Sequence, residues 1–85
     1  MEETTTRFEQ AQVRVKGLAK APSTEQLLEL YALYKQSTAG DATGTRPGMM
    51  DFKGRAKFDA WAGKKGLAKE DAMKSYVALV DQLAR

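Results

Sequence analysis

Residues 34–61, YKQSTAGDATGTRPGMMDFKGRAKFDAW, join the end of one predicted helix to the start of the next. The connection between them, AGDATGTRPGMM, has glycines at positions 40, 44 and 48 and a proline at 47, which is too many turn-forming residues for regular structure. A loop this long is uncommon in a small domain, and such loops are more often functional or disordered than simple connections. The segment therefore indicates two helices separated by a long loop.

Helical patterns dominate the rest of the chain as well, and no stretch alternates apolar and polar residues with the period of a strand. Two of the predicted helices begin with capping boxes, TRFE at residues 6–9 and STEQ at residues 23–26. The four predicted helices cover residues 5–19, residues 24–38, residues 51 to about 63, and residues 68 or 69 to the end of the chain. We therefore expect an all-α protein.

The length and composition limit both the architecture and the chemistry. A chain of 85 residues is expected to form one domain, residues 1–85, with a modest core, so a ligand must sit in a groove or among helices. The absence of cysteine and histidine excludes disulfides, thiolate zinc sites, cysteine nucleophiles and ordinary serine triads. The carboxylates lie on polar faces or at a helix start. These features favour binding over catalysis, and we expect no catalytic residue, metal or cofactor.

Neither a membrane span nor a signal segment is expected. The longest apolar runs are only a few residues, and the N-terminus MEETTTRFEQ has neither a basic start nor a hydrophobic segment. We therefore predict a soluble, cytoplasmic protein.

The net charge of +3 is locally concentrated. Within residues 46–57, the only acidic residue is Asp51, whereas four residues are basic: Arg46, Lys53, Arg55 and Lys57. This cluster leaves open a basic helical module that binds nucleic acid, and a protein-interaction module is a further alternative. Acidic residues mixed through every helix, and the lack of a recognition-helix pattern, argue against nucleic acid as the partner.

Two lysines interrupt the apolar faces of the second and third helices. Because a helix advances about 100° per residue, Lys35 falls between Tyr31 and Leu28 on the apolar arc. Its stem could cover apolar surface while the ammonium reaches water, or the ammonium could bind an anion beside the aromatic rings. Lys57 interrupts the third helix in the same way, next to Trp61. A second lysine on a separate helix strengthens the hypothesis of a shared anion site.

Other residues on these faces also allow more than one interpretation. Tyr76 lies at the centre of the apolar arc of the fourth helix, where it is either a core tyrosine that needs a hydroxyl partner or a phosphate donor. Lys16 lies at the edge of the apolar stripe of the first helix, and its position favours a solvated face. The remaining large apolar side chains are predicted to be buried, Phe58 and Trp61 in the core and Met49 and Met50 as a plug beneath the long loop.

The chain resembles the acyl-CoA-binding protein family, the small four-helix carriers of long-chain acyl-CoA esters. The resemblance extends from about residue 8 to residue 83 and is most specific in residues 34–61, with KEDAMKSYV at residues 69–77 following at the family's spacing. Its elements are Tyr-Lys-Gln, Gly-Asp, Arg-Pro-Gly-Met, Asp-Phe, Gly, Ala-Lys and Asp-Ala-Trp. The resemblance implies an up-down-down-up four-helix bundle with a long loop between the second and third helices, a monomeric state and no enzymatic activity.

The resemblance also implies a ligand site and a function. The 3′-phosphate of the ligand would be held by the residues matching Tyr31, Lys35 and Lys57, with Tyr76 close by and Lys16 closing from the first helix. Tyr34 matches the position beside the adenine, and Leu27 and Leu28 match positions that line the acyl channel. The implied function is non-covalent binding of medium- to long-chain acyl-CoA esters, as an intracellular carrier and pool former in lipid metabolism, with acyl-CoA-using enzymes as candidate partners.

Two positions depart from the family pattern. Phe58 stands where the family commonly has tryptophan, which keeps an aromatic ring but shortens it. Ala68 replaces the usual serine or threonine cap of the fourth helix, and this replacement predicts a loss of about 1 kcal/mol at that helix start. Neither departure removes an implied ligand contact.

Overall fold

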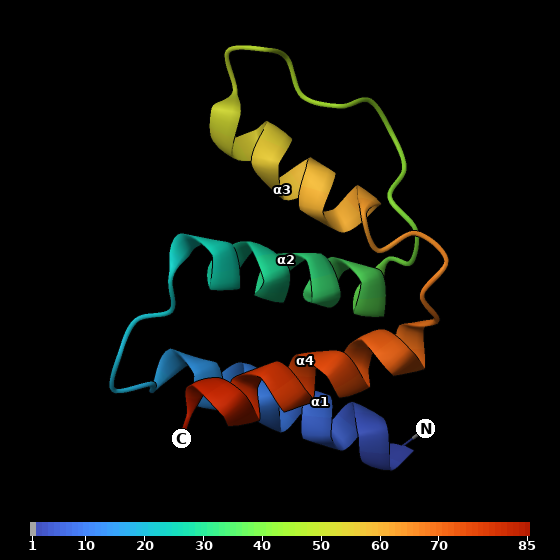
Figure 1. The fold of residues 1–85 in the computed structure, drawn as a ribbon. Helices are drawn as coiled ribbons and strands as arrows, with labels where there is room; N and C mark the ends of the chain where they lie inside the picture. Colours follow the sequence, from blue (N-terminus) through green and yellow to red (C-terminus); the bar gives the residue numbers. More distant parts are fainter. Residues whose placement is uncertain (1) are drawn as a thin grey trace.

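The computed structural model describes residues 2–85, and its regular structure within that range is helical, without strands (Figure 1). The helices are α1 (Glu2–Lys16), α2 (Thr24–Thr38), α3 (Phe52–Ala62) and α4 (Lys69–Leu83). The all-α prediction is confirmed. None of the helices in residues 2–85 combines the length and the hydropathy that crossing a bilayer requires.

The helices follow an up-down-down-up course. Figure 1 shows α1 and α4 running in one direction and α2 and α3 in the other. The centre of the fold is the contact of α4 with both α1 and α2, whereas α3 packs against α2 alone. Because α2 and α3 are parallel, their connection must travel back along a helix length, roughly 16 Å for the 11 residues of α3. This geometry explains why the loop at residues 39–51 is long.

The hydrophobic core lies between α1, α2 and α4. Two aromatic rings meet at its centre, because Phe8 of α1 and Tyr76 of α4 form an edge-on pair with centroids 5.1 Å apart. The buried cluster consists of Phe8, Ala11, Leu30, Leu33, Tyr76 and Val80. Each of these residues lies on the apolar face that the helical spacing indicates.

Phe58 and Trp61 are not core residues, so that prediction is wrong. Helix α3 contains no buried residue, and both rings are only partly covered, 6.3 Å apart in an edge-on pair. The indole nitrogen of Trp61 donates a hydrogen bond of 2.7 Å to the carbonyl oxygen of Gly40 at the start of the long loop. Helical spacing correctly identified the apolar face of α3, but this face covers α2 and the loop rather than the core.

The predicted start and end of the first helix are also wrong. Helix α1 begins at Glu2 and ends at Lys16, so Thr6 is an exposed residue inside the helix and not its cap. The first turn carries two acidic residues, Glu2 and Glu3, and the last turn carries basic ones, an arrangement that suits the helix dipole. The helix therefore starts earlier than the TRFE motif indicates, and Gly17 follows its last residue.

The other helix starts agree with the sequence. The Ser23 side chain accepts a hydrogen bond from the Gln26 backbone amide, and the Gln26 side chain reaches back to the Ser23 amide, so the second capping box is confirmed. Asp51 caps α3 by accepting the Gly54 amide at 2.9 Å. Ala68 has the extended backbone of an N-cap residue but provides no side-chain hydrogen bond, as predicted.

A buried glutamine fastens both irregular connections to the C-terminal end of α2. Gln36 is 1% exposed, and its Nε2 donates 2.8 Å hydrogen bonds to Asp41 Oδ1 and to the carbonyl oxygen of Leu67. Asp41 also accepts the Gly66 backbone amide at 2.9 Å, and Gly66 has the positive φ of 91° that glycine tolerates best. The Gly66 hydrogen bond, followed by that of Gln36, holds the pKa of Asp41 below its usual range.

Candidate ligand-binding groove

Two hollows adjoin along one side of α2. The first, about 300 Å³, lies between α2 and the end of α1 and reaches α4, and the second, about 420 Å³, lies between α2 and α3. The first is lined by Val15, Lys16, Pro22, Leu27, Leu30, Tyr31, Tyr34 and Tyr76. The second is lined by Thr24, Leu27, Leu28, Tyr31, Lys53, Ala56 and Lys57. Because Leu27 and Tyr31 line both hollows, we treat the two as one groove.

Two lysine–aromatic pairs connect α2 to α3 beside this groove. The ammonium nitrogen of Lys57 lies 5.5 Å from the centroid of the Tyr31 ring, and that of Lys35 lies 4.8 Å from the Trp61 ring. Both distances fall within the range of cation–π attraction. Each pair takes one residue from each helix, and the pairs are one helical turn apart along the α2–α3 contact.

Neither lysine of these pairs forms an ion pair with a carboxylate of residues 2–85. By contrast, the neighbouring Lys64 is paired with Glu29 at 2.6 Å. Lys35 is partly buried and Lys57 is exposed, and the ammonium groups of both lie over aromatic rings. Without a carboxylate partner, these ammonium groups keep hydrogen-bond donors available for an anion, as an anion site requires.

Tyr76 combines a buried ring with a position on the groove. The residue is only 5% exposed, packs against Phe8, and lines the first hollow together with Tyr34 and the exposed Lys16. Burial, followed by the proximity of Tyr34, raises the pKa of the Tyr76 phenol. The phenol is therefore neutral near physiological pH and keeps a proton that it can donate.

The structure gathers seven of the eight site residues expected from the sequence along the groove: Lys16, Leu27, Leu28, Tyr31, Tyr34, Lys57 and Tyr76. The eighth, Lys35, lines neither hollow; it is partly buried over Trp61, one turn beyond Tyr31. Lys35 therefore lies outside the lining of the groove.

Sequence reasoning missed six lining residues, Val15, Pro22, Thr24, Leu30, Ala56 and Lys53. A signal existed for Lys53, because it precedes Lys57 by four residues and so shares its helix face. Val15 and Leu30 stood out only as members of apolar stripes. No sequence signal marks Pro22 or Thr24, because the fold brings the α1–α2 connection over the hollow.

The chemistry of the groove is that of an amphiphile-binding site. Leucines and tyrosines form its walls, and lysines stand along its edges. Among residues 2–85, His, Cys, Asp and Glu side chains form no group of three that could hold a metal ion. The fold and the groove together define a small helical binding protein suited to a ligand with an apolar chain and an anionic head.

Comparisons with known proteins assign this class to a family. The family model described as "Acyl CoA binding protein" matches residues 5–80, so the chain belongs to the acyl-CoA-binding protein family. It is 58% identical over 76 residues to acyl-CoA-binding protein homolog 1 of Caenorhabditis elegans, covering 89% of this chain and 88% of the relative. It is 53% identical over 76 residues to the acyl-CoA-binding protein of Saccharomyces cerevisiae, covering 89% and 87%.

Solved structures agree with the assignment. The crystal structure of Oryza sativa acyl-CoA-binding protein 2 superposes with a TM-score of 0.92 at 41% identity, covering 96% of this chain and 89% of that one. The solution structure of the yeast acyl coenzyme A binding protein gives a TM-score of 0.70 at 53% identity, covering 89% and 88%. The family resemblance and the four-helix fold expected from the sequence are therefore confirmed.

Proposed function

We propose that this protein binds fatty acyl-CoA esters non-covalently and acts as their carrier. The observation that carries the proposal is the groove along α2, which has apolar walls and Lys57 in its lining, with Lys35 over Trp61 one turn away. Neither Lys35 nor Lys57 has a carboxylate partner among the described residues. Membership of the acyl-CoA-binding protein family supports it. The role is binding and not catalysis, in keeping with the family and with a groove that offers lysines, tyrosines and leucines.

The proposed contacts divide into a headgroup part and a chain part. Lys35 and Lys57 bind the 3′-phosphate, since an ammonium group is a compact charge that forms charge-assisted hydrogen bonds without strict geometry. Tyr31 and Tyr76 add phenol donors, and Tyr34 lies beside the adenine. Lys16 completes the site from the end of α1. This arrangement places the anionic head where positive charge is concentrated.

The acyl chain occupies the apolar part of the groove beside Leu27 and Leu28. Each buried methylene contributes about 0.8 kcal/mol, so ten sheltered carbons supply on the order of 8 kcal/mol before ordering costs. Chain burial then determines affinity, and the headgroup contacts determine which ligand is accepted. We accordingly propose a preference for medium- to long-chain esters, and a monomeric, cytoplasmic carrier that maintains an acyl-CoA pool and supplies acyl-CoA-using enzymes.

Calorimetric titration with a series of saturated acyl-CoA esters tests this function. The affinity should increase with chain length over at least the medium-chain range, because each added methylene buries more apolar area. Free coenzyme A is the matched control, since it presents the same headgroup without a chain, and it should bind far more weakly. Equal affinity for all chain lengths, or no binding of a C16 ester, would contradict the proposal.

The nucleic-acid alternative is not favoured. Part of the basic cluster is already engaged, because Arg46 forms a two-point contact with Asp59, with bonds of 2.9 Å and 2.7 Å. Lys57 stands over the Tyr31 ring at the groove. These two contacts leave the cluster without a continuous basic face of the kind that tracks a phosphate backbone.

A further inference from the structure

Three large apolar side chains are exposed close together where the long loop meets α3. Met49 is 77% exposed, Met50 88% and Phe52 75%, so the predicted plug beneath the loop does not exist. We call these three residues the apolar tip. Single exposed apolar residues are common on soluble proteins, but three within four positions form a patch of the kind that marks an interaction site. None of them lines the groove, so the proposed ligand does not cover them.

The apolar tip lies at an edge of the molecule. Figure 1 shows the end of the loop and the first turn of α3 on the side away from α1 and α4. Helix α3 touches only α2 among the other helices, so nothing in α1 or α4 shields this end. The tip therefore projects from the bundle as a convex surface and does not form a cleft.

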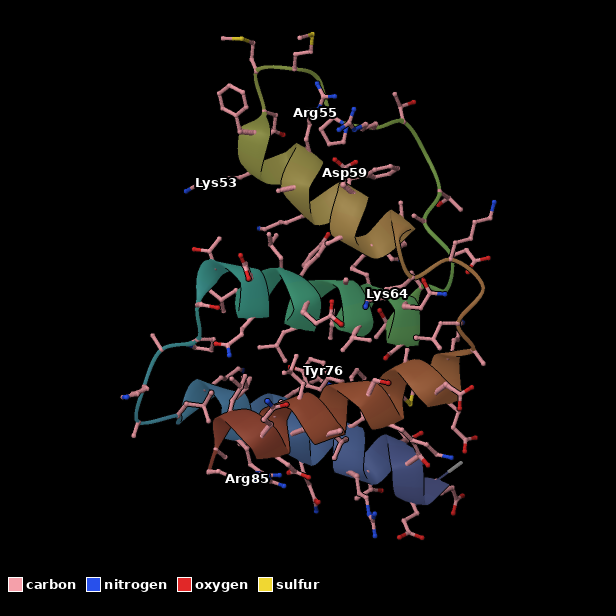
Figure 2. All side chains as sticks on the ribbon, in the orientation of Figure 1. Lys53, Arg55, Asp59, Lys64, Tyr76 and Arg85 are labelled. Atoms are coloured by element: carbon pink, nitrogen blue, oxygen red, sulfur yellow. The ribbon has the colours of Figure 1, made fainter. Side chains whose placement is uncertain are left out.

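The surroundings of the tip are basic. Residues 46–57 contain four basic side chains and one acidic side chain. Arg46 is paired with Asp59 and Lys57 stands over the Tyr31 ring, so Lys53 and Arg55 are the basic residues considered for the tip. The one acidic group, Asp51, is occupied in capping the Gly54 amide. Figure 2 shows Lys53 and Arg55 on the first turns of α3, and neither forms an ion pair with a described residue. An apolar centre is thus flanked by unpaired positive charge.

We propose that the apolar tip docks on the surface of a lipid bilayer that contains anionic lipids. The two methionines and Phe52 enter the boundary between headgroups and acyl chains, and Lys53 and Arg55 contact lipid phosphates. A protein partner fits these observations less well, because stable interfaces bury roughly 800 Å² on each partner and three projecting side chains offer far less. A bilayer deforms around a convex surface and needs no complementary shape.

Docking by the tip has a consequence for the groove. Lys53 follows the tip directly in the chain and also lines the α2–α3 hollow together with Lys57. A docked molecule therefore presents this side of the groove to the membrane, from which an amphiphilic ligand can enter or leave. This consequence rests on the proposed function, whereas docking itself does not require a ligand.

Vesicle sedimentation with the ligand-free protein tests the docking. The vesicles contain phosphatidylcholine with about one-third phosphatidylserine, and phosphatidylcholine alone serves as the neutral comparison. The double variant Met50→Ser with Phe52→Ser should lower partitioning into anionic vesicles by about tenfold, because the inserted apolar area is lost. Val13→Ser is the matched control, since Val13 is 71% exposed on α1 outside the tip, and it should partition like the wild type.

Folding and ligand binding are measured on the same proteins. Because the substituted side chains are exposed and lie outside the groove, the double variant should keep its helical circular dichroism and its affinity for a C16 acyl-CoA. Failure of that ligand to bind the wild type would contradict the proposed function. The vesicle sedimentation would still test the docking, because it uses the ligand-free protein. The docking inference is overturned if the wild type does not bind anionic vesicles, if the double variant binds them equally well, or if the tip instead mediates a dimer in solution.

Discussion

At the scale of single residues, Lys35 and Lys57 show how an aromatic ring can hold a positive charge in place. The ammonium groups of Lys35 and Lys57 stand over the rings of Trp61 and Tyr31. The aromatic faces stabilise the positive charge electrostatically. A cation held in this way loses less freedom when an anion arrives, which reduces the ordering cost of binding.

Substitution of either lysine by alanine tests its place in the headgroup site. Lys35→Ala and Lys57→Ala should each weaken acyl-CoA binding by roughly 1.5 to 3 kcal/mol, the scale of a hydrogen bond to a charged group. Lys20→Ala, which removes the same charge from the exposed α1–α2 connection, is the matched control and should leave the affinity unchanged. Unchanged calorimetric affinity in both test variants would show that the phosphate lies elsewhere, even if the protein is a carrier.

At the scale of the helices, the N-termini differ in how well they are capped. Helix α2 has a complete capping box at Ser23, and α3 has an aspartate cap at Asp51, but Ala68 leaves α4 without a side-chain cap. The backbone of Ala68, with φ −63° and ψ 148°, already has the extended conformation that a capping serine adopts. Helix α4 supplies two of the six residues of the buried cluster, Tyr76 and Val80, and packs against both α1 and α2, so its stability affects the entire bundle.

Introduction of a cap should therefore stabilise the protein. Ala68→Ser should raise the free energy of unfolding by about 1 kcal/mol, because a serine oxygen satisfies a backbone amide in the first turn. Urea unfolding followed by circular dichroism measures the change, with an unaltered m-value as evidence that the unfolded state is the same. Ser23→Ala is the opposite control and should lose about 1 kcal/mol. If Ser23→Ala destabilises and Ala68→Ser has no effect, the cap argument fails for α4.

At the scale of the whole molecule, polar contacts of the loop and of the α3–α4 connection supplement the packing of α3 on α2. Trp61 donates to the Gly40 carbonyl, Arg46 reaches Asp59 from the loop, and Lys64 pairs with Glu29 of α2. The Gln36–Asp41 contact fastens the loop and the α3–α4 connection to the same end of α2. One side of the groove is formed by α3, so these contacts determine the shape of the binding site as well as the fold.

The Asp41 contact predicts a specific dependence of stability on pH. The pKa of Asp41 is lowered in the folded protein, so its carboxylate contributes stability above its unfolded pKa of about 3.9, and this contribution is lost as the pH falls through the folded pKa. In wild-type protein, unfolding free energies measured in urea should therefore fall on acidification more steeply than in Asp41→Asn. Glu9→Gln, on the exposed face of α1, controls for the removal of one negative charge. Identical pH profiles for wild type and Asp41→Asn would contradict the prediction.

Much of this protein was determined by local sequence. The capping residues Ser23 and Asp51 define where α2 and α3 begin, because the groups that satisfy the first amides are encoded within three residues. The apolar stripes fix which helix faces are covered, and Lys57 interrupts one of those stripes where the groove forms. The same reasoning was wrong for Thr6. Helix α1 begins before the TRFE motif, and its first turn contains the acidic residues Glu2 and Glu3.

The tertiary structure decided what those covered faces touch. Periodicity showed that Trp61 faces inward, but only the parallel packing of α3 on α2 placed it against Lys35 and the loop instead of the core. Met49 and Met50 have the composition of buried residues, yet the path of the loop leaves them in solvent. Gln36 is polar and nevertheless buried, because its hydrogen-bond partners come from residues 5 and 31 positions away along the chain. Contacts of this kind depend on how distant segments meet, and that information is absent from any short stretch of sequence.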